Sequence, residues 1–508
     1  MRKPLLSLGL VALLAGACSG ANYAASPGAY YTAPPPAHHA PTLVPEQPPA
    51  ATPYDGVTFQ DPGTNPFVDP RVDNESTFGL DVDTASYTVA RRFISDGHLP
   101  DPASVRVEEF VNYFDQDYAA PEDEAFAIHV DGAPSPFLAG DEVLLRIGLK
   151  ARDVADRSRP AAALTFVIDV SGSMAREDRL GLVKQSLALL VEGLRPDDIV
   201  GIVVYGSEAR VVLPPTSARQ PGTILDAINT LEPEGSTNAE AGLRLGYEMA
   251  RAQLRPEGIN RVVLASDGVA NVGATSAETI LGEIRHDAET GIQLVTVGFG
   301  MGNFNDVLLE RLADDGDGFY AYVDDIDEAR RVFVDDLTGT LQSVALDARV
   351  QVDFSADIVE AYRLIGYENR AIADEQFRND RVAAGAIGAG HSVTALYALR
   401  LSGEGGRQDR VATISLRWTD PATTRPAEVA RDVQVADVAG SFPSASSTLK
   451  LDAIVAATAE RFRHSPWGET YSLHDVNEIA GQVAEDLPQT QEVHDFLDLL
   501  RRAADLER

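Results

Sequence analysis

Residues 164–180, LTFVIDVSGSMAREDRL, decide the fold, because a strand-like apolar run passes directly into a polar loop and then into a helical pattern. The apolar run ends just before Asp169, and Ser171 and Ser173 follow it. Beyond this loop, apolar residues recur with the period of an amphipathic helix, at Leu180, Val183, Leu187, Leu190, Val191 and Leu194. The stretch therefore predicts a strand, a polar loop and a helix in that order.

Further apolar runs alternate with helical patterns along the chain, at Ile199–Tyr205, Val262–Ala265 and Ile292–Val297. This alternation is typical of a parallel sheet that helices cover on both faces. Too few residues separate Tyr205 from Val211 for a crossover connection, so Val211–Leu213 should pair antiparallel at an edge of the sheet. We therefore expect residues 160–345 to form an α/β domain with a doubly wound, mostly parallel, Rossmann-like sheet.

Two regions of different pattern flank this domain. Residues 70–155 combine two short amphipathic helical patterns with strand-like runs at Phe126–Val130 and Val143–Leu149, which predicts a small α+β unit. Residues 346–508 begin with the β-type runs ARVQVDF, HSVTALYALRL and RVATISLRW and end in helical patterns. We expect this C-terminal region to be β-rich and then helical.

The N-terminus has the features of an export signal. Arg2 and Lys3 precede an apolar stretch that is too short for a permanent membrane span, which takes about 20 residues. The small residues before Cys18 resemble a bacterial lipobox, which implies that residues 1–18 are a signal peptide and that Cys18 is lipidated. The alternative is an ordinary cleaved signal with an incidental cysteine. The Pro- and Ala-rich residues 19–69 predict a disordered tether. Because of the lipobox resemblance, we expect a lipid-anchored protein of the bacterial envelope, on the outer or plasma membrane.

The charge of the chain excludes some partners. The formal net charge is -35, from 42 basic and 77 acidic residues. A chain this acidic repels nucleic acid and anionic lipid surfaces, so we expect no nucleic-acid partner. Metal ions or cationic partners are compatible with it.

Three polar clusters follow elements of the predicted sheet. Asp169, Ser171 and Ser173 follow one strand, Thr237 precedes a helix in EGSTNAEAGL, and Asp267 follows a strand in VVLASDGVAN. Ligands of open α/β sheets bind beyond the carboxyl ends of the strands, so these side chains could converge. Hydroxyl and carboxylate oxygens are the donors that hard cations such as Mg²⁺ prefer. The alternative is a tight turn with a helix cap and solvated aspartates.

The three clusters together resemble the metal-ion-dependent adhesion site of von Willebrand factor type A domains. The resemblance implies that Ser171, Ser173 and Thr237 ligate Mg²⁺ or Mn²⁺ directly, and that Asp169 and Asp267 act mainly through metal-bound water. It also implies a protein partner whose exposed Asp or Glu completes the metal shell. In related domains the last helix shifts when the ligand binds, and DIDEARRVFVDDLTGTLQ, residues 325–342, is the matching segment.

Enzyme alternatives have weaker signals. A phosphoryl-transfer enzyme could use Asp169 as its nucleophile, but Ser171 stands where an acid-base residue is needed. LDVDTAS, with Asp81, Asp83 and Thr84, resembles a phosphatase motif but lacks a preceding buried strand, so we interpret it as a structural turn. The acidic stretch ADDGDGFYAYVDDID, residues 313–327, predicts a solvated loop. We expect no enzyme activity.

The resemblance extends beyond the central domain. The stretches TFGLDVDTASYTVARRFI, RVEEFVNYFD, LIGYENR and IGAGHSVTALY resemble a bacterial family of adhesion-site lipoproteins. In that family an N-terminal unit and a C-terminal domain of unassigned function flank the type A domain. The predicted function is a lipid-anchored, metal-dependent protein-binding module, and a structural envelope scaffold is the remaining alternative.

Overall fold

The computed structural model describes residues 54, 56–80, 83–155, 158–175, 177–268, 274–301, 304–335, 339, 341–382, 384–403, 405–438 and 440–507. All of them belong to one compact unit, Ala51–Arg508. The predicted signal peptide 1–18, Cys18 and residues 19–53 of the predicted tether lie outside the described residues. Among the described residues, no helix combines the length and the apolar character that crossing a membrane requires.

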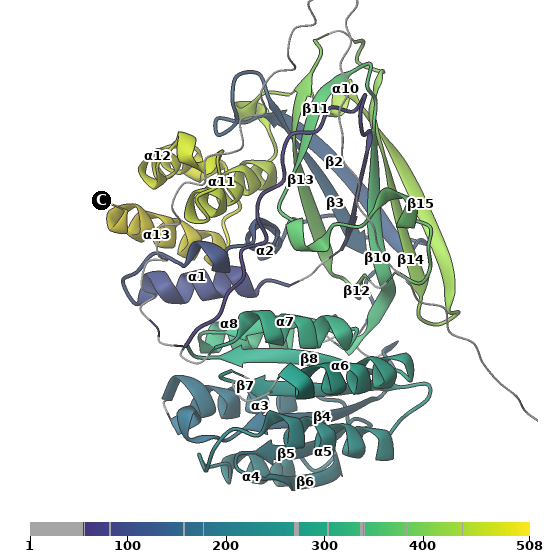
Figure 1. The fold of residues 1–508 in the computed structure, drawn as a ribbon, viewed down its shortest axis with the longest axis vertical. Coiled ribbons are helices and arrows are strands. Elements are labelled where there is room, and N and C mark those ends of the chain that lie inside the picture. Colours follow the sequence, from purple (N-terminus) through teal and green to yellow (C-terminus); the bar gives the residue numbers. More distant parts are fainter. Residues whose placement is uncertain are drawn as a thin grey trace, which may run out of the picture. The chain divides into compact units, whose positions relative to one another are not determined.

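The central region forms a six-stranded, mostly parallel sheet, of which the sequence predicts every strand except the last, β9 (Figure 1). Its strands, in spatial order, are β6 (Ala209–Ser217), β5 (Ile199–Tyr205), β4 (Ala162–Asp169), β7 (Ile259–Ser266), β8 (Ile292–Phe299) and β9 (Tyr320–Val323). All neighbours pair in parallel except β6, which pairs antiparallel with β5 at the edge. Every residue of β4 is buried, as expected for a central strand with both faces covered.

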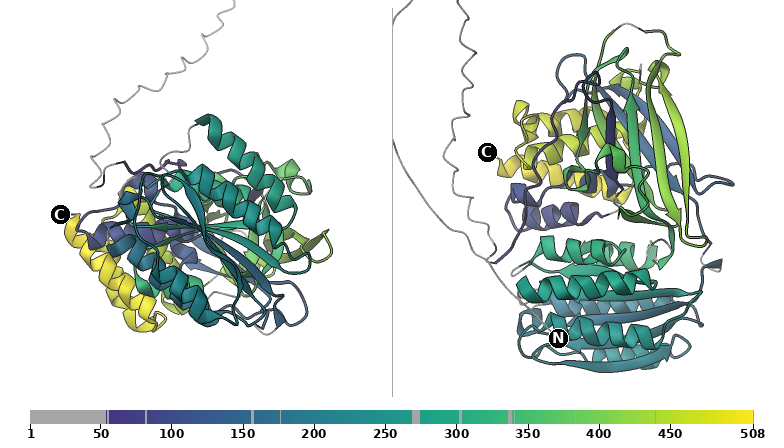
Figure 2. Two further views of the ribbon diagram at one scale, coloured as in Figure 1. Left: turned by 90° about the horizontal axis from the view of Figure 1, so that it is seen from below. Right: turned by 45° about the vertical axis from the view of Figure 1, so that its right-hand side comes forward.

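Helices cover both faces of this sheet (Figures 1 and 2). One face shares its apolar core with α3 (Leu182–Gly193), α4 (Pro221–Asn229) and α8 (Ile326–Arg330). The other face packs against α5 (Ala239–Ala252), α6 (Ala274–Glu289) and α7 (Asp306–Asp315). The sheet is therefore doubly wound.

The rest of the unit contains two antiparallel sheets. One has the order β1 (Glu75–Gly79), β10 (Ser343–Phe354), β14 (Arg410–Asp420) and β15 (Arg425–Gln434), and β12 (Gly385–Gly388) also pairs with β10. The other has the order β11 (Val359–Ile365), β13 (Ser392–Leu401), β3 (Val143–Ala151) and β2 (Phe126–Pro134). Side chains from both sheets form one apolar core, so the two sheets pack face to face.

Strands from both flanks of the central region share these sheets. β1 pairs with β10, and β3 pairs with β13, although each pair is separated by more than two hundred residues of sequence. The N-terminal and C-terminal flanks therefore form one sandwich. Antiparallel strands need only matching edges, because the ladder of hydrogen bonds does not depend on separation along the chain.

A helical layer packs on the second sheet. It comprises α1 (Ala85–Ser95), α2 (Val107–Asn112), α11 (Ser447–Phe462), α12 (Leu473–Val483) and α13 (Gln491–Leu506). These helices share an apolar cluster with Leu144, Ile365, Leu396 and Ala398 of that sheet. A further short helix, α10 (Val435–Val438), follows β15. Both helices predicted in the N-terminal flank are confirmed as α1 and α2.

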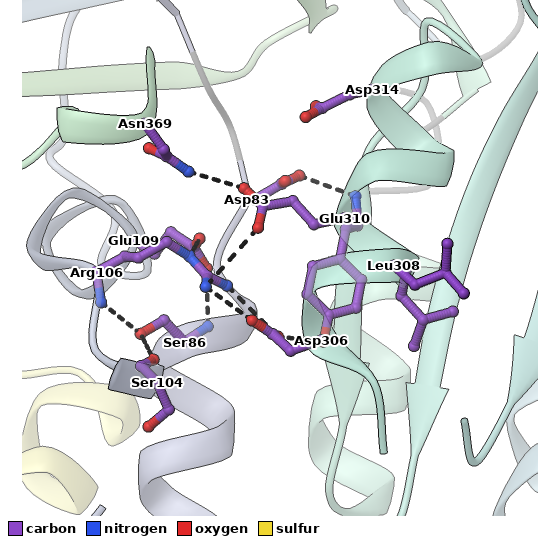
Figure 3. A network of polar contacts seen from close by, with 12 residues as sticks. Asp83, Ser86, Ser104, Arg106, Glu109, Asp306, Leu308, Glu310, Asp314 and Asn369 are labelled. Atoms are coloured by element: carbon purple, nitrogen blue, oxygen red, sulfur yellow. Dashed lines mark hydrogen bonds and ion pairs between the residues drawn. The ribbon is translucent and has the colours of Figure 1, made fainter. Parts of the chain in front are cut away.

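Buried ion pairs join the helical layer to the central region (Figure 3). Arg106, at the start of α2, pairs with Glu109 of the same helix and, at 2.8 Å, with Asp306 at the start of α7. The Tyr320 hydroxyl also donates to Asp306 at 2.8 Å, and the Tyr320 backbone N–H donates to Asp83 at 2.8 Å. Removing Arg106 would leave Glu109 and Asp306 buried without their counter-ion, so these contacts hold α2, α7 and β9 together.

Two expectations differ from the structure. Residues 56–69, placed in the tether, lie against the folded unit: Thr58 donates to the Phe304 carbonyl at 2.9 Å, and the Phe59 ring packs near Phe93 and Phe304. Aromatic anchors thus order a segment whose proline content suggested a linker. The acidic stretch 313–327 is not a solvated loop throughout, because Tyr320–Val323 within it forms the buried strand β9.

Candidate metal centre

The predicted site residues lie at the carboxyl edge of the central sheet. Asp169 is the last residue of β4, and Asp267 directly follows β7, the parallel neighbour of β4. The chain leaves β4 first toward β5 on one side and later returns to β7 on the other. The connections diverge at this reversal of strand order, where open α/β sheets bind their ligands.

Asp169 organises the loop that follows it. Its Oδ1 accepts the Ser171 backbone N–H at 2.8 Å, which closes a tight turn and brings the Ser171 hydroxyl to the edge. A short 3₁₀ turn, Gly172–Ala175, follows, and the hydroxyl oxygens of Ser171 and Ser173 lie 3.0 Å apart. The alternation of Asp and Ser therefore places one carboxylate and two hydroxyls in one turn.

The loop that carries Thr237 is bonded to the loops after β4 and β5. Gly172 N–H donates to the Gly235 carbonyl at 3.1 Å, and Asn238 N–H donates to the Gly206 carbonyl at 3.0 Å. Gly235 has φ +71, and a Cβ there would lie 2.4 Å from the Ser207 hydroxyl oxygen, so only glycine fits this approach. Thr237 lies between these two anchored residues and is half-buried. The structure thus brings Thr237 to the same edge as Asp169.

Asp267 is held by an arginine. Arg179, which precedes α3, pairs with Asp267 and also donates to the Ser173 carbonyl at 2.9 Å. Both charged side chains are almost fully buried, whereas Ser173 is half-buried like Thr237. The two carboxylates are therefore buried at the carboxyl edge of the sheet, and the hydroxyls of Ser173 and Thr237 lie nearer to solvent.

Burial disfavours the charged form of the carboxylates. It raises the pKa of Asp169 to about 6, although hydrogen bonds from Ser171 and Ser266 favour the ionised form. Burial also raises the pKa of Asp267, against the opposing effects of Ser173 and Arg179. A cation between such carboxylates would stabilise their ionised forms, because it supplies the countercharge that water supplies to exposed groups.

The chemistry of these donors fits a hard divalent cation. Five side chains supply only oxygen: the carboxylates of Asp169 and Asp267, and the hydroxyls of Ser171, Ser173 and Thr237. Within the described ranges, no group of three or more His, Cys, Asp or Glu side chains could hold a metal ion. A site with two carboxylates and three hydroxyls contains too few of these residue types to form such a group.

Two residues of this edge were not predicted from the sequence. The Ser266 hydroxyl donates to Asp169 Oδ2 at 3.0 Å, and Gly268 N–H donates to Ser266 Oγ at 3.1 Å. Arg179 is the second. Ser266 is adjacent to Asp267 in the motif, which was a usable signal, whereas nothing local to Arg179 indicates its contact with a residue 88 positions away.

The residues of the phosphatase-like motif, unlike Asp169, do not lie at this edge. Asp83 accepts the Tyr320 N–H and lies 3.5 Å from Arg370, and Thr84 accepts from Arg331 at 2.8 Å. Both belong to the junction between α1 and β9, and Asp81 lies outside the described residues. The phosphoryl-transfer alternative that uses Asp169 needs a charge-stabilising lysine. The basic residue that contacts Asp267 is instead an arginine, Arg179.

Comparisons with known protein families agree with this fold. A family model described as "von Willebrand factor type A domain" matches residues 163–336, and one described as "Uncharacterized protein YfbK, C-terminal" matches residues 339–506. A third, "von Willebrand factor", matches residues 54–145. The sheet, its helices and the matched region together define a type A domain protein.

The chain belongs to the family of bacterial type A domain proteins that includes YfbK of Escherichia coli K12. It is 36% identical to that protein over 441 residues, which cover 82% of this chain and 75% of the relative. Inter-alpha-trypsin inhibitor heavy chain H3 of Homo sapiens is 30% identical over 180 residues, or 34% of this chain and 19% of that protein. A solved type A protein from Catenulispora acidiphila aligns with 76% of this chain and 91% of its own, at 14% identity and a TM-score of 0.47.

Membership has a general functional consequence. Type A domains mediate adhesion and other protein–protein interactions, commonly with a divalent metal at the site formed by this motif, and proteins of this kind are generally not enzymes. This chain is therefore a protein of the interaction class.

Proposed function

We propose that this protein is a lipid-anchored envelope protein whose type A domain binds a partner protein through a divalent metal ion. Asp169, Ser171, Ser173, Thr237 and Asp267 hold Mg²⁺ or Mn²⁺, and an Asp or Glu of the partner is the last ligand. The observation that carries the proposal is the gathering of two buried carboxylates and three hydroxyls at one edge of the sheet.

The ligand types explain why the partner would be acidic. The three side chains that would contact the ion directly are neutral hydroxyls, and the two carboxylates would act mainly through metal-bound water, so the ion keeps positive character toward an incoming ligand. The half-buried positions of Ser173 and Thr237 leave the outer side of the site accessible from solvent. An incoming carboxylate would therefore meet an incompletely neutralised cation.

Calorimetric titration of Mn²⁺ into the compact unit, residues 51–508, tests the metal site. We expect saturable binding to the wild type and none to Asp169→Ala, with circular dichroism showing that the variant is folded. Asp197→Ala is the matched control, because Asp197 is an aspartate of the same domain that pairs with Arg195 at the surface. Equal affinities of wild type and Asp169→Ala would contradict the assignment.

A pull-down from envelope extract tests the partner. Wild-type protein should retain its partner in Mg²⁺ and release it with a chelator, and Thr237→Ala should fail to bind. Hydrolysis of phosphate esters by the purified protein, abolished by Asp169→Asn, would instead favour the phosphoryl-transfer alternative.

The segment expected to respond to the partner is attached to α1. Arg91 of α1 donates to Asp324 at 2.8 Å and to Glu328 of α8 at 3.1 Å. Glu328 also pairs with Arg331, in the π-helical turn Arg331–Asp335 that continues α8. A shift of α8 must rearrange these buried contacts. A ligand can drive this shift only if it binds the protein with different affinities in the original and the shifted position of α8. Hydrogen exchange at residues 327–335, with and without partner, would detect the shift.

A further inference from the structure

Arg179 links three loops at the edge that carries the candidate metal site. Its Nη1 donates to the Ser173 carbonyl at 2.9 Å and to Asp267 Oδ2, and its Nη2 donates to the Met301 carbonyl. These partners follow β4, β7 and β8 respectively. The residue is 3% exposed, so the guanidinium is a structural part of the edge and not a surface charge that happens to lie nearby.

The fold leaves space for this side chain. Gly300 has φ +71, and a Cβ there would lie 2.7 Å from Arg179 Cγ and 2.8 Å from its Nε. Any residue other than glycine would therefore displace Arg179 as well as strain the backbone. The Nε atom is buried and has no hydrogen-bond partner among the described residues. The guanidinium is thus held by its two terminal nitrogens, and its position is set by Asp267 and two backbone carbonyls.

This position changes the charge of the site. Asp169 and Asp267 are its two carboxylates, and Arg179 contacts one of them directly. One positive charge thus offsets one of the two negative charges that would attract a divalent cation. A bound ion is also repelled by the guanidinium, because burial weakens the screening that water provides between exposed charges.

We propose that Arg179 is a built-in counter-cation that lowers the affinity of the site for metal alone and makes metal binding depend on an acidic ligand. The inference rests on the proposed function, because it concerns the same site. With Arg179 present, the two carboxylates, the guanidinium and a divalent ion sum to a net positive charge. A carboxylate from a partner restores neutrality, and by reciprocity each of the two ligands strengthens the binding of the other.

Titration calorimetry with Mn²⁺ tests the proposal, performed on residues 51–508 in chloride and again in acetate, which serves as the simplest carboxylate probe. We expect Arg179→Met to bind Mn²⁺ at least about tenfold more tightly than the wild type in chloride. The gain in Mn²⁺ affinity from acetate should be larger for the wild type than for Arg179→Met.

Two further variants separate charge from geometry and from general destabilisation. Arg179→Lys keeps the charge but loses the planar fork, so its Mn²⁺ affinity should stay near that of the wild type. Arg251→Met removes an arginine that pairs with Asp287 at 2.7 Å, on the end of α5 away from the site, and should leave the affinity unchanged.

Thermal denaturation gives a readout that does not depend on a partner. Without metal, Arg179→Met should melt below the wild type because Asp267 loses its counter-ion. Saturating Mn²⁺ should raise its melting temperature by more than that of the wild type, because tighter binding stabilises the folded state more.

The outcomes distinguish this inference from the proposed function. Unchanged or weaker Mn²⁺ binding by Arg179→Met would overturn the counter-cation role, even if the wild type binds metal. Binding by Arg179→Met alone, with none by the wild type in chloride or in acetate, would support the effect of the guanidinium and contradict the proposed function, because the native guanidinium would then exclude the ion even when a carboxylate is present. No binding by either protein would overturn both.

Discussion

The Ser266 hydroxyl donates to Asp169 Oδ2 at 3.0 Å and so joins the ends of the neighbouring strands β7 and β4. Asp169 is fully buried, and its other oxygen accepts the Ser171 N–H at 2.8 Å. The two hydrogen bonds together fix the plane of the carboxylate. Ser266 therefore orients a candidate ligand without itself being one of the five predicted donors.

Ser266→Ala should weaken Mn²⁺ binding by about tenfold, because residues that orient metal ligands typically contribute that much to metal affinity. It should also lower the free energy of unfolding by about 1–2 kcal/mol, since Asp169 loses a buried hydrogen bond. Calorimetry and urea denaturation measure the two effects. Ser186→Ala is the control, because this buried serine donates to the Leu182 carbonyl within its own helix α3 and should not change metal affinity. Wild-type Mn²⁺ affinity in Ser266→Ala would show that Asp169 does not need this donor.

Arg106→Met should destabilise the unit by about 3–5 kcal/mol, because Glu109 and Asp306 would remain buried without their counter-ion. The midpoint of urea denaturation measures the change. Arg410→Met removes an exposed arginine that pairs with Asp353 at 3.3 Å, and should cost at most about 1 kcal/mol. Similar small losses in both variants would mean that the buried junction does not hold the helical layer to the central region.

Glu108→Gln should change how stability depends on pH. Burial raises the pKa of Glu108 to about 7 in the folded state, and the negative charge of Glu368 adds to this effect. The positive charge of Arg106 lowers the pKa but does not cancel the rise, and Arg463 also faces this pair. A carboxyl whose pKa is raised on folding stabilises the folded state fully below the unfolded value of 4.5, and this contribution disappears as pH rises through about 7.

Between about pH 5 and about pH 8 the wild type should therefore lose roughly 1–3 kcal/mol of stability relative to Glu108→Gln, which cannot ionise. Urea denaturation across this pH range gives the comparison. Glu257→Gln, a change of an exposed carboxylate, serves as the control and should follow the wild-type profile. Parallel profiles for the wild type and Glu108→Gln would contradict the raised pKa.

Cys18→Ser should release the protein from membranes into the soluble envelope fraction, if Cys18 carries the lipid anchor that its sequence context predicts. Two acyl chains give stable anchoring, whereas one chain binds a membrane only marginally. Fractionation of cells that express either form measures the distribution, and mass spectrometry identifies the mature terminus. An unmodified Cys18 in the membrane fraction would contradict the prediction.

Much of the central region could be predicted from local patterns. Buried strands and amphipathic helices differ in the spacing of their apolar residues, so β4, β5, β7, β8 and α3 follow directly from periodicity. The antiparallel edge follows from the few residues between β5 and β6, which cannot form a crossover. The five candidate ligands were found because each lies at the end of a predicted strand or in a loop beside a predicted element, in an order that resembles the adhesion site of type A domains.

Several of the missed features depend on residues that are distant in sequence, and one is a short strand. β9 is short, and its acidic neighbours concealed it, although every one of its residues is buried. Residues 56–69 are ordered by contacts with Phe93, Phe304 and Tyr362. The composition of residues 56–69 gives no indication of these contacts. A local pattern reports what a segment can form, and tertiary packing decides which of those forms is stabilised.

The sequence by itself determined the doubly wound sheet, because the spacing of apolar residues along short segments distinguishes strands from helices. The five candidate ligands came from the resemblance of three short polar clusters to the adhesion site of type A domains. Only the tertiary structure decided that the two flanks share one sandwich, that Ser266 orients Asp169 and that Arg179 is buried against Asp267. Strand pairing and ion pairing depend on proximity in space, and a contact such as that of Arg179 with Asp267 exists only once β4 and β7 lie side by side.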